Sequence, residues 1–184
     1  MIKEFNDWLK VRAAHIGFCI SVGLIFGVLL FIISCFVHPA HAATMSVYGG
    51  RAVSNSITDV HSAAWGVEQE TGDWDFGYLN EGHQRGEKRD GIYAMRKFSY
   101  QFAKRITTSF AIGPYFTATT ETASDGINYQ DHYSWAALAD ASIRYRIDNN
   151  WSLTGRWAHV LYAARNKDAD VFLIGFGYSP HGRR

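Results

Sequence analysis

Apolar and polar residues alternate along most of the chain after residue 43. This period of two, with many aromatic and β-branched residues and with Gly, Asn or Asp at the interruptions, predicts strands. No helical stripe of useful length accompanies it. The pattern divides this part of the chain into eight segments: 46–53, 60–70, 73–80, 91–102, 105–118, 132–146, 150–162 and 169–178.

The connections between these segments alternate in length. Tight turns are expected at Thr71-Gly72, at Ala103-Lys104 and in "IDNN" around Asp148, whereas "SNSITD", "NEGHQRGEKRD", "TTETASDGINYQD" and "AARNKDA" are long and polar. Short and long connections therefore lie at opposite ends of an antiparallel meander. Bacterial outer-membrane barrels are built in this way, with turns in the periplasm and loops outside, and closure pairs the first strand with the last.

The side of each strand on which the apolar residues lie predicts which face of the barrel meets lipid. In 132–146 the odd positions from Tyr133 are apolar, whereas Asp140 and Arg144 share the other face. Aromatic residues lie near both ends of the strands, as in the girdles of membrane barrels. We therefore predict an all-β fold, an eight-stranded antiparallel transmembrane up-and-down β-barrel over 43–178, followed by a C-terminal tail over 179–184.

Alternation by itself does not distinguish this barrel from a soluble, lipocalin-like barrel with its apolar face inside. The charged residues favour the membrane barrel, because they can neutralise each other only if their faces converge in the narrow interior of eight strands. We expect a plugged interior lattice of nine charged residues: Glu68, Glu70, Asp73, Asp75, Arg105, Asp140, Arg144, Arg146 and Arg156.

The first 42 residues have a different pattern. Three basic residues precede an uncharged run over 17–37, and Ala40 and Ala42 then form an Ala-x-Ala site. This order predicts a secretory signal peptide over 1–42, cut after Ala42. Two alternatives remain. The run is long enough for an uncleaved membrane anchor, and "IISC" resembles a bacterial lipobox that would place a lipid on Cys35.

Removal of that peptide changes the composition. Both cysteines leave with it, and 15 basic and 15 acidic residues remain. A chain without thiols suits an oxidising compartment, and zero net charge argues against nucleic acid as a partner. There is no Gly-rich phosphate loop, and the eight histidines lack metal-ligand spacing, so no cofactor and no metal are expected.

Over 45–178 the chain resembles the small eight-stranded outer-membrane β-barrels of Gram-negative bacteria, in its architecture, its signal peptide and its closing segment "VFLIGFGY". The resemblance implies insertion into the cell outer membrane by the barrel-assembly machinery, with outer-membrane lipid or lipopolysaccharide as partner. Such chains usually end on an aromatic residue, whereas here "SPHGRR" follows Tyr178. Either the tail is tolerated or the assembly signal is weak.

The stretch 80–91, "NEGHQRGEKRDG", is expected to be the second external loop. Its bases would meet lipopolysaccharide phosphates, and its acids would meet the cations that bridge them. The same rim also carries the parts of a nucleophilic hydrolase, a hydroxyl, an imidazole and a carboxylate. Ser134, His132 and Glu81 are the candidate catalytic residues, because His132 and Ser134 share one strand face in "DHYSW" and Glu81 is expected nearby.

Two families of lipid A enzymes show short resemblances. Lipid A 3-O-deacylases carry His-x-Ser-Asn near the C-terminal hairpin. "HYSW" is similar, but it has Trp135 for Asn and lies one hairpin too early, and in the matching hairpin Leu161 stands where Ser is needed after His159. Lipid A palmitoyltransferases carry "GLYAM", similar to "GIYAM" here, but the Asp of their Asp-Ser pair is missing before Ser99. No catalytic residue is carried over from either family.

Two functions from different classes follow. The favoured interpretation is an integral outer-membrane barrel without enzymatic activity, with a plugged charged interior and external loops that contact lipopolysaccharide or a surface partner. The alternative is a lipid A-modifying enzyme, either an acyl ester hydrolase or an acyltransferase, that uses Ser134, His132 and Glu81.

Overall fold

The structure, a computed structural model, describes residues 43–54, 61–84, 87–122, 129–162 and 168–180. The predicted signal peptide over 1–42 lies outside the described residues, as do its alternatives of an anchor or a lipid on Cys35. Residues 181–184 of the predicted tail also lie outside them.

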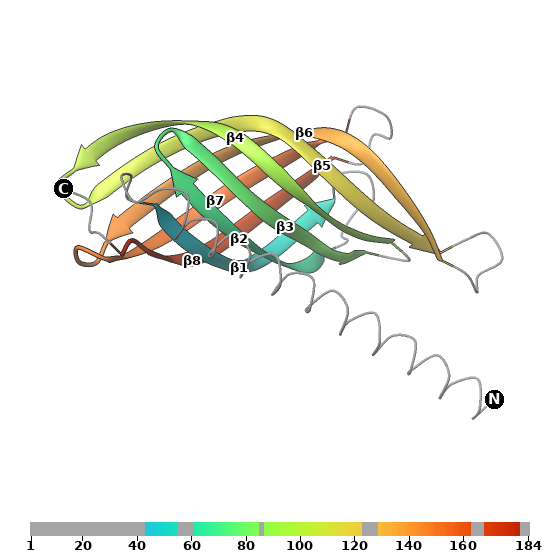
Figure 1. Cartoon of the computed structure of the whole chain (residues 1–184). Helices are drawn as coiled ribbons and strands as arrows, with labels where there is room; N and C mark the ends of the chain where they lie inside the picture. The colour runs from blue at the N-terminus through green and yellow to red at the C-terminus, as the bar shows by residue number, and fades with distance from the viewer. Residues whose placement is uncertain (1–42, 55–60, 85–86, 123–128, 163–167, 181–184) are drawn as a thin grey trace, which may run out of the picture. The chain divides into compact units, whose positions relative to one another are not determined.

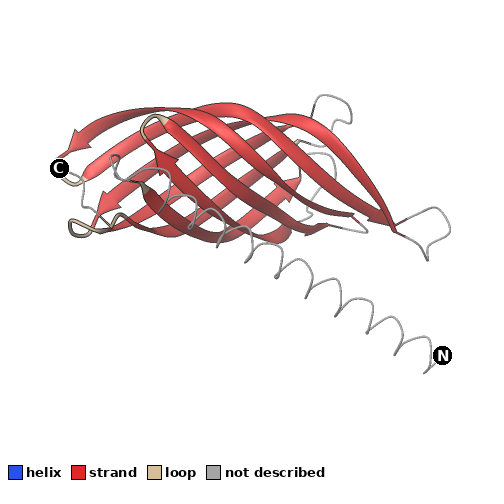
Figure 2. Cartoon of the chain, in the orientation of Figure 1, coloured by secondary structure: helices blue, strands red, loops and turns tan. Residues whose placement is uncertain are grey.

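Eight antiparallel strands form a closed barrel, in which each strand pairs with the next and β8 pairs with β1 (Figure 1). The strands are β1 (Thr44–Ser54), β2 (His61–Thr71), β3 (Trp74–Gln84), β4 (Glu87–Ala103), β5 (Ile106–Thr122), β6 (Tyr129–Arg146), β7 (Trp151–Leu161) and β8 (Ala169–Tyr178). Strands account for most of the described chain (Figure 2). That part of the chain contains no helix long and apolar enough to cross a membrane. The predicted eight-stranded up-and-down barrel is confirmed.

The three tight connections, 72–73, 104–105 and 147–150, lie together at one end of the barrel, which we call the turn end. The other end is called the loop end. Gly72 has a φ of 59° in the first turn, a backbone conformation that favours glycine. In the third turn the Asp148 carboxylate accepts hydrogen bonds from the amides of Asn150 and Trp151, at 2.7 Å each, and these lower the pKa of that carboxyl.

The predicted loop over 80–91 is mostly paired strand, which corrects the sequence interpretation. β3 continues to Gln84 and β4 begins at Glu87, so only 85–86 fall between them. The pairing passes through an irregularity between Asn80 and Gly82, where Gly82 has a φ of 88°. Backbone pairing requires no apolar side chains, so a polar hairpin extends the ladder beyond the alternating segment. β5 and β6 likewise extend into the predicted loop 119–131, to Thr122 and from Tyr129.

Strands of unequal length leave one hairpin projecting at the turn end. Pairing of β3 with β4 ends with Trp74 opposite Arg96, whereas β4 continues to Ala103 and pairs there with β5. The tip of the β4–β5 hairpin therefore extends beyond β3.

The outward face is apolar, as the alternation predicts. On β6, Tyr133 and Trp135 are each 67% exposed and Ile143 is 60% exposed, whereas Asp140 on the other face is 4% exposed. β8 repeats this facing with outward Phe172, Ile174, Phe176 and Tyr178. A surface of exposed aromatic and aliphatic side chains around a polar interior suits a lipid environment.

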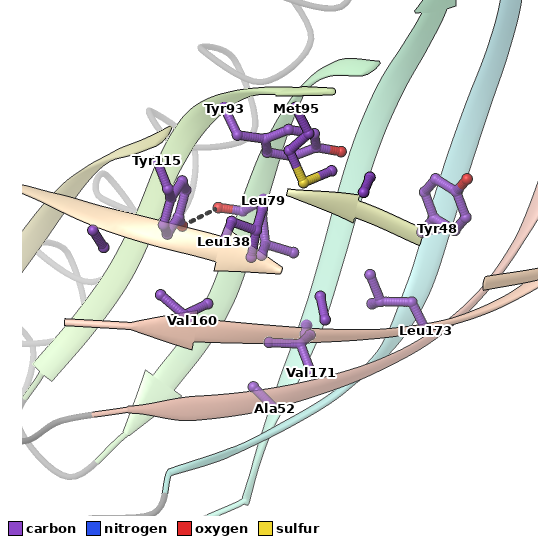
Figure 3. Close-up of a cluster of buried hydrophobic side chains, with 14 residues drawn as sticks. Tyr48, Ala52, Leu79, Tyr93, Met95, Tyr115, Leu138, Val160, Val171 and Leu173 are labelled. Carbon is purple, nitrogen blue, oxygen red and sulfur yellow. Dashed lines mark hydrogen bonds between the residues drawn. The ribbon is translucent and has the colours of Figure 1, made fainter. Parts of the chain in front are cut away.

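An apolar layer of buried side chains lies within the barrel (Figure 3). Its larger aliphatic side chains are Leu79, Met95, Leu138, Val160, Val171 and Leu173. On β6, Asp140 lies nearer the turn end than Leu138, whereas on β3 Glu81 lies nearer the loop end than Leu79. The interior is thus layered, with charged residues on both sides of an apolar layer that the sequence analysis did not predict.

Three members of the predicted lattice lie elsewhere. Arg146 lies at the turn end of β6, where its guanidinium donates to the Lys104 carbonyl at 2.8 Å, and the other two are exposed. Asp73 is exposed and pairs with the exposed Arg96 at 2.9 Å, and Arg105 is exposed in the β4–β5 turn. Both residues lie at the turn end, where the alternation that assigns faces inside the strands no longer applies.

Candidate functional site

Arg156 is the centre of the interior charged cluster. Its Nη1 lies 2.7 Å from Glu68 Oε2 and 2.9 Å from the Tyr93 hydroxyl, and its Nε pairs with Asp140. The guanidinium also lies over the rings of Tyr48 and Tyr93, at 5.4 and 5.2 Å from the centroids. Arg156 is 6% exposed, so these contacts take place away from water.

Lys97 and Arg144 extend this cluster across the barrel. Lys97 Nζ lies 2.8 Å from both Glu70 Oε2 and Asp75 Oδ1, and Arg144 Nη1 lies 2.6 Å from the same Glu70 oxygen. The seven charged residues come from five strands: Glu68, Glu70, Asp75, Lys97, Asp140, Arg144 and Arg156. Their ion pairs link opposite walls of the barrel.

The sequence prediction missed Lys97, Tyr48 and Tyr93 in this cluster. Lys97 and Tyr93 share the inward parity of β4, which would have revealed them. The phenol hydroxyls of Tyr48 and Tyr93 both donate to Glu68, at 3.1 and 2.9 Å. Tyrosine at inward positions is therefore part of the network, although aromatic residues are expected first in the outer girdles.

Glu81 forms a separate cluster nearer the loop end. It is fully buried, and one carboxylate oxygen accepts hydrogen bonds from the hydroxyls of Tyr115 at 3.1 Å and Tyr162 at 2.9 Å. Its other oxygen lies 3.6 Å from Nε of the buried Arg89. The prediction that Glu81 lies on an external loop is wrong, because β3 continues past it and directs the side chain inward.

His132 and Ser134 both line a cavity of about 380 Å³ at the loop end, together with Glu87, Arg89 and Tyr162 among others. Ser134 Oγ lies 3.5 Å from Thr117 Oγ1. Within the described part of the chain, no hydrogen bond joins His132 to Ser134 or to Glu81. The structure brings two of the three candidates to one cavity, and their catalytic roles stay predictions.

The outward face is interrupted near the loop end by polar residues that we call the outer collar. Its members are Arg51, His61, Lys88, Asp90, His159 and Asp170. His159 Nδ1 and the Trp157 indole nitrogen each lie 2.9 Å from Asp170 Oδ1, and Lys88 Nζ lies 2.8 Å from Asp90. His159 pairs with Asp170 across strands, and Val53 lies opposite both Asp170 and His61, so this row spans β7, β8, β1 and β2.

Among the described residues, no group of three or more His, Cys, Asp or Glu side chains could hold a metal ion.

Comparison with known proteins identifies the class of fold. No protein-family model and no curated protein matches the chain. Neisserial surface protein A has a similar structure, with a TM-score of 0.55 and 11% identity, over 76% of this chain and 96% of that one. The N-terminal β-barrel domain of OprF from Pseudomonas aeruginosa matches with a TM-score of 0.52 and 12% identity, over 75% and 98%. Ail of Yersinia pestis matches with a TM-score of 0.51 and 8% identity, over 75% and 96%.

These likenesses show the fold. The chain is a small eight-stranded β-barrel of the outer-membrane type, and its apolar outward face agrees with a location in the cell outer membrane.

Proposed function

We propose that this protein is a non-enzymatic outer-membrane barrel whose loop end contacts lipopolysaccharide and whose interior is closed by its charged clusters. The outer collar is the observation that carries the proposal. Charged groups are costly against hydrocarbon, so a polar row on the lipid-facing surface belongs at headgroup level. Its bases suit lipid phosphates, and its acids suit the divalent cations that bridge them.

The interior clusters support the second half of the proposal. Eight strands leave only enough room for side chains or one small ligand, and Arg156, Lys97 and Arg144 extend across that space to carboxylates. A wide aqueous pore does not fit this arrangement. A surface protein is another partner that a charged loop end could meet, but the collar faces lipid, which favours lipopolysaccharide.

The collar is tested with a pair of outward arginines at opposite ends of the barrel. Arg51 belongs to the collar, whereas Arg96 is 46% exposed at the turn end. We expect Arg51→Gln, combined with His159→Gln, to lower the lipopolysaccharide retained per barrel several-fold, because phosphate contacts are lost. Native mass spectrometry of the barrel released from outer-membrane extracts measures this.

Arg96→Gln is the matched control and should retain as much lipopolysaccharide as the wild type. Chelation of divalent cations should lower the lipopolysaccharide retained by the wild type, because Asp90 and Asp170 then lose their bridging ions. Equal retention by the collar variant and the control would refute the proposed contact.

A lipid A-modifying enzyme is the second candidate, and the loop-end cavity is the observation that favours it. The cavity brings His132 and Ser134 together and also contains the carboxylates of Glu87 and Asp131. An acyl ester hydrolase or acyltransferase would need Ser134 as nucleophile and His132 as base, with a carboxylate to orient the base. Glu81 is held by two phenols, and Glu87 and Asp131 are the carboxylates that line the same cavity as His132 and Ser134.

A further inference from the structure

A second cavity, of about 290 Å³, opens at the turn end. Four basic residues line it, Lys104, Arg105, Arg144 and Arg146, together with the carboxylate of Asp148. Arg144 and Arg146 share the inward face of β6 with the buried Asp140, so this space belongs to the mouth of the barrel. We call it the vestibule.

The charges of the vestibule do not balance. Glu70 neutralises Arg144 at 2.6 Å, and Asp148 offsets one further cation. Within the described residues, no ion pair joins a carboxylate to Lys104, Arg105 or Arg146. Two positive charges therefore remain in excess in a concave space, where low-dielectric walls strengthen the attraction for an anion.

The basic groups are held in place by the backbone. Arg146 Nη2 donates to the carbonyl of Lys104 at 2.8 Å, and the Arg146 amide donates to the carbonyl of Arg105 at 2.8 Å. These bonds fix the end of β6 against the β4–β5 turn, so Arg146 is ordered beside Lys104 and Arg105 before any ligand arrives. The β6–β7 turn forms another wall with Asn149, whose side-chain amide can donate, and with Asn150, whose Nδ2 donates to the carbonyl of Ser179 at 2.9 Å.

From this geometry we propose that the vestibule binds a phosphate group. Cationic donors and neutral donors line it on the β4–β5 turn, on β6 and on the β6–β7 turn. A tetrahedral oxyanion can accept hydrogen bonds from several directions at once. Guanidinium groups suit such an anion because they donate in a planar fork. The vestibule is open at the turn end, which in outer-membrane barrels faces the periplasm.

The experiment uses the full chain folded in micelles of an uncharged detergent. Inorganic phosphate is titrated against chloride at matched ionic strength, and binding is followed by the backbone amide shifts of 104–107 and 144–151 and by phosphorus line broadening. The wild type should bind phosphate with saturation. The double variant Lys104→Gln with Arg105→Gln, at exposed turn positions, should bind about ten-fold more weakly.

Arg96→Gln is the control, because Arg96 is an exposed arginine at the same end but outside the vestibule. Its affinity for phosphate should equal that of the wild type, and circular dichroism should show that all variants are folded. Three outcomes would overturn the proposal: no saturable shift beyond that of chloride, an unchanged affinity in the double variant, or an equal loss in Arg96→Gln.

Two sources of the phosphate group are separated by a second titration. Trp151 also lines the vestibule and packs on Tyr178 at 4.9 Å between ring centroids, so an aromatic pair of the kind found at headgroup depth lies beside it. A short-chain phosphatidylglycerol is therefore added in place of inorganic phosphate. Saturable shifts of the same amides with the lipid assign a lipid headgroup, and shifts with inorganic phosphate alone assign a free phosphate, both of which support the site.

Discussion

At the scale of single residues, the interior of this barrel depends on a few buried cations that each serve more than one acid. Arg156 contacts Glu68 and Asp140, and Lys97 contacts Glu70 and Asp75. Desolvation of such charges is costly, and their mutual attraction offsets that cost only while every partner is present. Loss of one such cation therefore removes a counter-charge from two buried carboxylates.

We expect Arg156→Leu to lower the free energy of unfolding by about 3 kcal/mol, because Glu68 and Asp140 lose that cation in a buried position. Ile143→Leu, on the lipid face at 60% exposure, should be nearly silent. Urea unfolding midpoints in detergent micelles compare the two variants. If the midpoints coincide, the cluster does not stabilise the barrel as described.

At the scale of elements, the β3–β4 hairpin shows how strand pairing continues toward the loop end, beyond the segments with alternating apolar residues. The register shifts between Asn80 and Gly82, and pairing resumes with Gly82 opposite Arg89. The Asn80 side chain accepts a hydrogen bond from the Gly82 amide at 2.8 Å. The Ser62 hydroxyl donates to the carbonyl of Glu81 at 2.5 Å, which ties β2 to this irregularity. Such a bulge bends the strand beside the buried Glu81.

Gly82→Ala should lower the free energy of unfolding by about 2 kcal/mol, since its φ of 88° disfavours a side chain. A Cβ there would also lie 2.2 Å from the Ala63 carbonyl oxygen. Gly155→Ala is the control, because a Cβ at that position meets no atom within 4 Å. The same urea titration measures both, and an equal stability of the two variants would contradict the bulge.

At the scale of the whole molecule, the two ends of the barrel differ in chemistry. The loop end carries the outer collar and the cavity with His132 and Ser134, whereas the turn end carries the basic vestibule. The apolar layer and the charged clusters separate them.

Lipid A from cells that overproduce the wild type, Ser134→Ala or an empty control should give identical mass spectra. Our reason is that Glu81 is engaged by Tyr115 and Tyr162, and that His132 has no hydrogen bond to Ser134 among the described residues. The gain or loss of one acyl chain with the wild type alone would establish the enzyme instead.

The sequence by itself determined the strand count, the alternation of turn lengths and the outward face. Each of these depends on a local property, the period of two and the residues at its interruptions, so β6 and β8 could be assigned from their own residues. The inward position of Asp140 and Arg144 followed from the same parity.

Only the tertiary structure decided how far the polar hairpins pair and which charges meet. Glu81 could not be placed from the sequence, because the extension of β3 to Gln84 depends on pairing with β4 and on the bulge at Gly82. Arg156 and Glu68 lie 88 positions apart, and their contact depends on closure of the barrel and on its stagger. The vestibule likewise exists only because the projecting β4–β5 turn is fixed against the end of β6, a juxtaposition that no local pattern records.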